Sequence, residues 1–197
     1  MNVLEAALAR LATDLDELRV PWALVGGFAV SVRSEPRFTR DVDVAVVVED
    51  DAGAEVLVRQ LIGRGYTVTG TVDQEYVARL ATARLLAPLP GDVVTDLLFA
   101  SSGIEREIAA GAERLEVIPG LTLPVASLAD LVVMKLLARD DSSRPQDAAD
   151  LVALRRAVTD DDLGDIRHAV ALVESRGYAR DRDLGAAMEA WYHLGRS

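Results

Sequence analysis

Hydrophobic residues near the start of the chain recur at helical spacing. They are followed by Pro21 and occupy positions Val3, Leu4, Leu8, Leu11, Leu15 and Leu18. This spacing gives a helix one apolar face, and the residue before a proline avoids helical geometry. We therefore predict an amphipathic first helix that ends before Pro21.

Strand-like and helical patterns then alternate along the chain. Turn residues and β-branched runs predict strands at residues 22–25, 41–48, 66–72, 79–87 and 92–100, with helices at 28–33 and about 52–63. After Pro124 the pattern turns helical, at 127–139, 147–158, about 159–176 and a last segment ending near His193. We expect residues 140–145 to form an ordered loop. The fold class is α/β (α+β): a mixed sheet flanked by helices over residues 1–124, and a helical region over 125–197 that packs on this core.

Two aspartates interrupt the apolar strand predicted at residues 41–48. Asp41 and Asp43 are separated by one valine, and alternation along a strand points both side chains the same way. Paired carboxylates repel each other where little water reaches them, and a divalent cation removes this repulsion. Mg²⁺ (or Mn²⁺) binds one or two carboxylates together with substrate phosphates. The alternative interpretation is a solvated strand face.

A glycine pair precedes this strand. Gly26 and Gly27 follow the predicted strand at 22–25 and open a helix, where free backbone N–H groups can bind phosphate. A plain turn is the structural alternative. The spacing of 13 residues between Gly27 and Asp41 places both features in one short unit, which together predict a metal and nucleotide site.

Composition limits the function classes. The 197 residues are 50% hydrophobic, enough for a sizeable core, and they include no cysteine, which excludes disulfides and thiolate zinc sites. No signal peptide or long apolar run is present, so we expect a soluble cytoplasmic protein. A net charge of −11 argues against a broad nucleic-acid surface. A local one remains open, because Arg33, Arg37 and Arg40 bracket the predicted site.

The chain has a single lysine against 20 arginines. Lys135 shares a helical stripe with Leu128, Leu131 and Val132, so it falls on the face expected to be buried, in a helix capped by Ser127. A buried ammonium needs a partner. We expect that partner to be a triphosphate or an active-site aspartate. The alternative is that the stem is buried and the amine reaches water.

Three further acids are candidates. Asp147 and Asp150 open the helix predicted at 147–158, where first-turn acids also favour the helix dipole, and one of them can serve that purpose alone. Asp96 lies within the apolar strand at 92–100, where an unpaired aspartate is unfavourable. It fits a third metal ligand or a general base for an acceptor hydroxyl.

These motifs resemble the polymerase-β-like nucleotidyltransferase superfamily, and most closely its AbiEii/AbiGii and MenT toxin group. The resemblance spans about residues 20–155. It lies in the Gly-Gly pair, an Arg-x-Thr-x-Asp-x-Asp strand, a later acidic strand, a helix with an embedded lysine and an Arg-x-x-Asp-x-x-Asp helix start. In this sequence these are Gly26, Gly27, Arg37, Thr39, Asp41, Asp43, Asp96, Lys135, Arg144, Asp147 and Asp150.

The resemblance implies a polymerase-β-like core and an enzyme that moves a nucleoside monophosphate from an NTP to the 3′ end of tRNA. It implies a growth-inhibiting toxin with a cognate antitoxin. Asp41, Asp43 and Asp96 would hold the metal, with Lys135, Asp147 and Asp150 completing the catalytic set. Gly26, Gly27, Arg37, Thr39 and Lys135 would bind the nucleotide. Thr39 would be phosphorylated by an antitoxin kinase, although it can equally just hydrogen-bond the turn.

Two other functions stay open. One is nucleotidylation of a small molecule, as in antibiotic-modifying relatives, which the acidic charge favours. The other is a non-catalytic nucleotide-binding module that retains the fold. The intact set of Asp41, Asp43 and Lys135 argues against the module.

Overall fold

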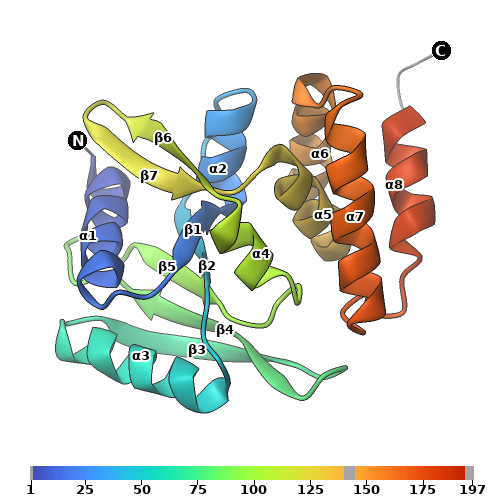
Figure 1. Cartoon of the computed structure of the whole chain (residues 1–197). Helices are drawn as coiled ribbons and strands as arrows, with labels where there is room; N and C mark the ends of the chain where they lie inside the picture. Colours follow the sequence, from blue (N-terminus) through green and yellow to red (C-terminus); the bar gives the residue numbers. More distant parts are fainter. Residues whose placement is uncertain (1, 140–144, 194–197) are drawn as a thin grey trace.

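A 7-stranded mixed sheet forms the centre of the protein in a computed structural model that describes residues 2–139 and 145–193 (Figure 1). The strand order is β3-β4-β5-β2-β1-β7-β6. The strands are β1 (Trp22–Val25), β2 (Asp41–Val46), β3 (Thr67–Gln74), β4 (Arg79–Leu86), β5 (Val94–Leu98), β6 (Glu113–Ile118) and β7 (Leu121–Val125).

Strands β1 and β2 lie at the middle of the sheet. Their apolar residues are almost fully buried, as expected for β-branched strands covered on both faces. β1 runs antiparallel to β2 with Val25 opposite Asp43, and β2 runs parallel to β5 with Asp43 opposite Asp96. This register sets acidic residues of two strands side by side.

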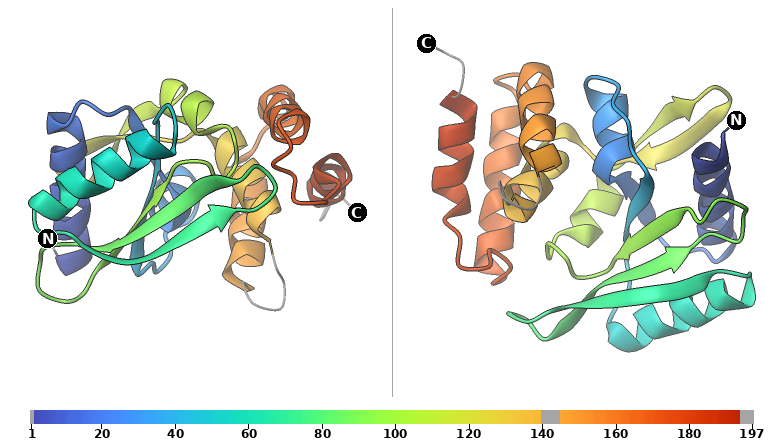
Figure 2. Two further views of the ribbon diagram at one scale, coloured as in Figure 1. Left: turned by 90° about the horizontal axis from the view of Figure 1, so that it is seen from below. Right: turned by 180° about the vertical axis from the view of Figure 1, so that it is seen from behind.

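Eight helices in the described part of the chain surround the sheet (Figures 1 and 2). α2 packs on β1 and β2, α3 packs on β4, and α5 to α8 gather on the side away from α1. The helices are α1 (Val3–Glu17), α2 (Gly26–Arg33), α3 (Asp51–Gly63), α4 (Glu105–Ala110), α5 (Leu128–Ala138), α6 (Pro145–Ala157), α7 (Asp162–Ser175) and α8 (Leu184–His193).

One buried hydrophobic cluster extends from Ala7 in α1 to Tyr192 in α8. It therefore includes residues on both sides of the boundary predicted at 124/125, which falls within β7. The division into a core and a C-terminal helical region stays a prediction. α5 and α6 pack on α2, which brings the C-terminal helices beside the glycine pair.

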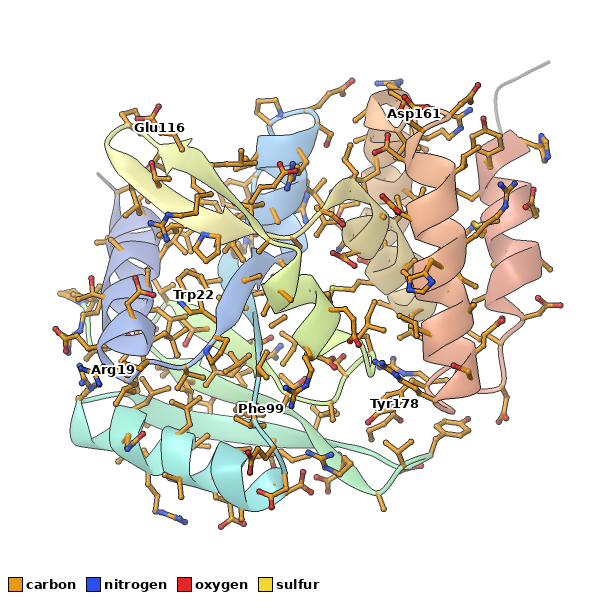
Figure 3. The ribbon with its side chains drawn as sticks, in the orientation of Figure 1. Arg19, Trp22, Phe99, Glu116, Asp161 and Tyr178 are labelled. Atoms are coloured by element: carbon orange, nitrogen blue, oxygen red, sulfur yellow. The ribbon has the colours of Figure 1, made fainter. Side chains whose placement is uncertain are left out.

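A loop contact fastens the C-terminal helices to the sheet. Tyr178, which follows α7, packs on Gly103 in the loop after β5 (Figure 3). Gly103 has a φ of +76°, and a Cβ there would lie 2.4 Å from Tyr178 Cδ2. Beside it, Arg176 Nη2 donates to Glu107 in α4 at 2.7 Å. Glycine is required at this joint both for the backbone and for space.

The mixed α/β class is confirmed, and most predicted elements are present. Helix α4 and strands β6 and β7 were not predicted, whereas the helix predicted at 127–139 is confirmed as α5 with Ser127 as its N-cap. The predicted strand at 41–48 ends earlier, at Val46. Residues 140–144, including most of the predicted loop and Arg144 of the motif, lie outside the described residues. Among the described helices, none has the length and apolar character needed to cross a membrane.

Candidate active site

The acidic residues of β2 and β5 share one face of the sheet. Asp41 and Asp43 alternate with the buried Val42, and Asp43 is paired in register with Asp96. Burial, with the neighbouring Asp96 and Asp41 carboxylates, raises the pKa of Asp43 to about 6, although the Lys135 ammonium and the Gly27 N–H act in the opposite direction. The neighbouring carboxylates therefore repel each other, and a cation bound between them would lower this electrostatic free energy.

Asp96 carries an ion pair that the sequence did not indicate. Arg84 on β4 lies opposite Asp96 in the antiparallel β4–β5 pair. Its Nε donates to Asp96 Oδ1 at 2.9 Å and its Nη2 to Oδ2 at 2.7 Å. This is a bidentate guanidinium–carboxylate pair, the geometry with the strongest directional preference. The hydrogen bonds and charge of Asp96 raise the pKa of Arg84 further.

Gly26 makes room for the Asp43 carboxylate. It has a φ of +62°, and a Cβ there would lie 2.0 Å from Asp43 Oδ2. The next residue, Gly27, lies in the first turn of helix α2, and its backbone N–H acts to lower the pKa of Asp43. An amide of this helix start thus already stabilises an anion, which is the property expected of a phosphate cradle.

Gly27 also makes room for the segment that enters β2. A Cβ at Gly27 would lie 2.6 Å from both Arg37 Nη2 and Thr39 Oγ1. Arg37 and Thr39 are partly buried, whereas Phe38 and Arg40 between and after them are exposed. Because side chains alternate on an extended chain, Arg37, Thr39 and Asp41 share the face toward α2. Thr39 Oγ1 donates to the Asp41 carbonyl at 3.3 Å, as expected if Thr39 hydrogen-bonds the turn before β2.

Lys135 has the anionic partner that its position predicts. Its Nζ lies 2.7 Å from Asp147 Oδ1 and 2.8 Å from Asp150 Oδ2, and its side chain is only 14% exposed. Both carboxylates come from the first turns of α6, so neither serves the helix dipole alone. The Lys135 charge also acts on Asp43, which links this cluster to the acids of the sheet.

Arg37 connects the residues around Gly27 with the cluster of Lys135, Asp147 and Asp150. Its Nη2 donates to Asp150 Oδ2 at 2.9 Å, and its Nε lies 2.6 Å from Asp150 Oδ1. The Asp150 side chain is fully buried between Arg37 and Lys135. A continuous chain of contacts therefore joins the glycine pair to the lysine cluster. It also includes the acids of β2, Arg37 and Thr39.

Two of the arginines that bracket the site in sequence have other contacts. Arg33 donates from Nε to the Ala126 carbonyl at 2.9 Å and from Nη1 to Glu113 at 2.7 Å, so it holds the end of β7. Arg40 is exposed and lies over the Phe38 ring at 5.7 Å. The sequence analysis missed Arg84, because nothing distinguishes it from the other arginines until β4 and β5 pair.

The donor set suits a hard divalent cation. Asp41 and Asp43 offer carboxylate oxygens on one face, and burial beside the Asp96 and Asp41 carboxylates raises the pKa of Asp43. No three His, Cys, Asp or Glu side chains within residues 2–139 and 145–193 are grouped tightly enough to hold a metal ion in this arrangement. The third acid, Asp96, is bound by Arg84. Asp41 and Asp43 are therefore the carboxylates suited to hold a metal ion as they stand. Asp96 could join them as a ligand only if Arg84 releases it.

Several solved structures share the fold of this chain. A nucleotidyltransferase-like protein from Paracoccidioides brasiliensis has a TM-score of 0.51 at 21% identity, over 95% of this chain and 92% of that one. ANT(2″)-Ia with adenylyl-2″-tobramycin gives 0.52 at 17%, over 87% and 98%. The lincosamide adenylyltransferase LnuA gives 0.51 at 14%, over 80% and 100%. These likenesses show the nucleotidyltransferase fold.

The search of curated proteins finds no match. The family model described as "Nucleotidyl transferase AbiEii toxin, Type IV TA system" matches residues 7–190, nearly the whole chain. The resemblance to the AbiEii group is thereby confirmed. The chain belongs to the AbiEii family of nucleotidyltransferase toxins of type IV toxin–antitoxin systems.

Proposed function

We propose that this nucleotidyltransferase transfers a nucleoside monophosphate from an NTP to the 3′ end of tRNA, and that this modification blocks translation. The observation that carries the proposal is the contiguity of the glycine pair, the Asp41–Asp43 strand and the Lys135 cluster. Family membership supports a toxin with a cognate antitoxin. The tRNA acceptor rests on the resemblance of the motifs to the MenT group.

Each residue has a role that follows from its chemistry. The N–H groups at Gly26 and Gly27 and the cations Arg37 and Lys135 would bind the triphosphate. Asp147 and Asp150 would hold the Lys135 ammonium in position. Asp41 and Asp43 would hold Mg²⁺ (or Mn²⁺), with Asp96 as third ligand or base. The bound metal would supply charge neutralisation for the phosphates.

The reaction is a substitution at the α-phosphorus. The acceptor hydroxyl oxygen forms a new bond to that phosphorus, the bond to the bridging oxygen of the β-phosphate breaks, and pyrophosphate leaves with the bonding electron pair. The hydroxyl proton passes to a carboxylate or to solvent. Positioning and electrostatic stabilisation account for most catalysis in such reactions, which agrees with a site built of cations and acids.

Thr39 would provide regulation of the same site. Its Oγ1 lies 2.6 Å from where a Cβ of Gly27 would be, so it contacts the start of α2. A phosphate on Thr39 would add about −1.5 to −2 charge there and compete with the triphosphate. An antitoxin kinase acting on Thr39 would therefore switch the toxin off. We expect Thr39→Glu to abolish transfer, and a Thr39→Glu protein as active as the parent would contradict this regulation.

A second candidate function is nucleotidylation of a small molecule. The net charge of −11 favours it, because an acidic protein repels a polyanionic acceptor. It uses the same nucleotide and metal residues and differs only in the acceptor.

Incubation with Mg²⁺, each labelled NTP in turn and total tRNA tests these functions. We expect label on tRNA from the parent and none from Asp41→Asn. Asp73→Asn, the same change at an exposed position of β3, is the matched control and should keep parental activity. Binding of NTP without label on tRNA would point to a small acceptor. The absence of both NTP binding and transfer would leave a non-catalytic module.

A further inference from the structure

The ion pair between Arg84 and Asp96 differs from the other arginine–carboxylate pair at the site. The Arg84 side chain is 51% exposed and Asp96 is 10% exposed. In the Arg37–Asp150 pair the values are 20% and 0%. The Arg84 side chain can move into water, whereas Arg37 is held inside the protein; the buried Asp96 carboxylate would then need another cation in place of Arg84.

Arg84 occupies both oxygens of Asp96. A carboxylate that accepts two guanidinium hydrogen bonds has little capacity left as a metal ligand or as a base. The strand register places Arg84, Asp96 and Asp43 in one row across β4, β5 and β2. Arg84 is therefore a positive charge at the edge of the acid cluster, where a cation would otherwise be expected.

We propose that Arg84 is an exchangeable counter-ion, which holds Asp96 in the metal-free protein and releases it when a divalent cation binds at the acids. The proposal rests on the nucleotidyltransferase function of the site. A divalent cation placed among Asp41, Asp43 and Asp96 would carry twice the charge of Arg84, which forms its ion pair with Asp96 and acts on Asp41 and Asp43 only from a longer distance. Release makes Asp96 available as the third acid of the site.

The consequence is that Arg84 opposes metal binding. Removal of its side chain frees Asp96 in advance, so the metal no longer has to break two charge-assisted hydrogen bonds. We expect Arg84→Gln to bind Mn²⁺ about tenfold more tightly than the parent, the equivalent of one such charged hydrogen bond.

Mn²⁺ titration of the full chain without nucleotide, followed by electron paramagnetic resonance, measures this affinity. The decisive comparison repeats Arg84→Gln in an Asp96→Asn background. An exchangeable counter-ion acts through Asp96, so the gain in affinity should vanish there. Arg114→Gln, which removes the same charge from an exposed position on β6, is the matched control and should leave Mn²⁺ affinity unchanged.

The outcomes separate the possibilities. An equal gain in the parent and Asp96→Asn backgrounds would reduce Arg84 to a general electrostatic effect and overturn the proposal. A lower melting temperature with unchanged Mn²⁺ affinity would make the pair a structural link between β4 and β5, and also overturn it. A parent that transfers nucleotide while Arg84→Gln shows no gain would overturn the counter-ion role alone. Failure of both proteins to bind Mn²⁺ would overturn the metal-dependent function too.

Discussion

Single residues at this site are constrained by their neighbours' side chains as much as by their own chemistry. Gly26 is required because Asp43 occupies the space of a Cβ, and Gly27 because Arg37 and Thr39 do. The glycine pair therefore shapes the site for the acids, besides its proposed role in binding phosphate. The sequence predicts a phosphate cradle at this pair but not the steric role, because that role depends on the approach of β2 to α2.

Gly26→Ala tests the steric role. The change imposes about 1–2 kcal/mol of left-handed backbone strain and displaces the Asp43 carboxylate. We expect nucleotidyl transfer to fall about a hundredfold, as displacements of about 1 Å at reacting groups do. The control is Gly63→Ala at the end of α3, where a Cβ meets nothing within 4 Å. Parental activity in Gly26→Ala would show that Asp43 tolerates the shift.

The Lys135 cluster contributes to stability as well as to charge. Lys135→Met removes the ammonium that Asp147 and the fully buried Asp150 share, and we expect the free energy of unfolding to fall by about 3 kcal/mol in urea titration. Adding Asp147→Leu removes one of the two carboxylates that lose this ammonium and should restore part of the loss. Arg59→Met, at an exposed ion pair on α3, should change stability by less than about 0.5 kcal/mol. Parental stability of Lys135→Met would contradict the paired arrangement.

Whole elements could be predicted from the sequence where burial is one-sided or complete. The first helix and strand β1 follow from a regular apolar stripe and a fully buried run. Strand β6 was missed because Leu115 and Val117 alternate with charged residues over only a few positions, too short a pattern to stand out. Helix α4 has 6 residues, too few to show a helical period. The contact of Arg84 with Asp96 was missed because strand register is set by pairing across the sheet.

The junction between α1 and the end of α3 depends on one buried acid. Asp14 accepts hydrogen bonds from Arg10 at 2.6 Å, Arg64 at 2.7 Å and Tyr66 at 2.9 Å. Burial alone would raise the pKa of Asp14, but these hydrogen bonds outweigh it and hold the pKa below its ordinary value of 3.8. The ionised form therefore stabilises the fold at neutral pH.

Asp14→Asn should lower the free energy of unfolding by about 2 kcal/mol at pH 7, since it removes charge-assisted hydrogen bonds. A lowered pKa in the folded state means that the unfolded state takes up a proton first as the pH falls. The advantage of the parent over Asp14→Asn should therefore shrink below about pH 4. Urea titrations at pH 7 and at steps toward pH 3 measure this difference, and a constant gap would contradict the proposed role of ionised Asp14.

The net charge of the whole molecule opposes binding of the acceptor that is proposed for the site. The chain carries −11 overall, yet its proposed acceptor is a polyanion. Among residues 2–139 and 145–193, Arg37, Arg40 and Arg84 lie in or beside the site, and Arg37 and Arg84 are already paired with Asp150 and Asp96. Recognition of the proposed tRNA acceptor would then depend on few phosphate contacts and on the chemistry of its end.

This gives a measurable salt dependence. Each phosphate neutralised lowers the logarithm of the binding constant by about 0.7 to 0.9 per decade of salt, so three arginines predict a slope no steeper than about −3. Fluorescence anisotropy of labelled tRNA with Asp41→Asn protein between about 50 and 200 mM NaCl measures it. A slope steeper than about −5 would require a broad basic surface, which an acidic chain could supply only through a partner or a second copy.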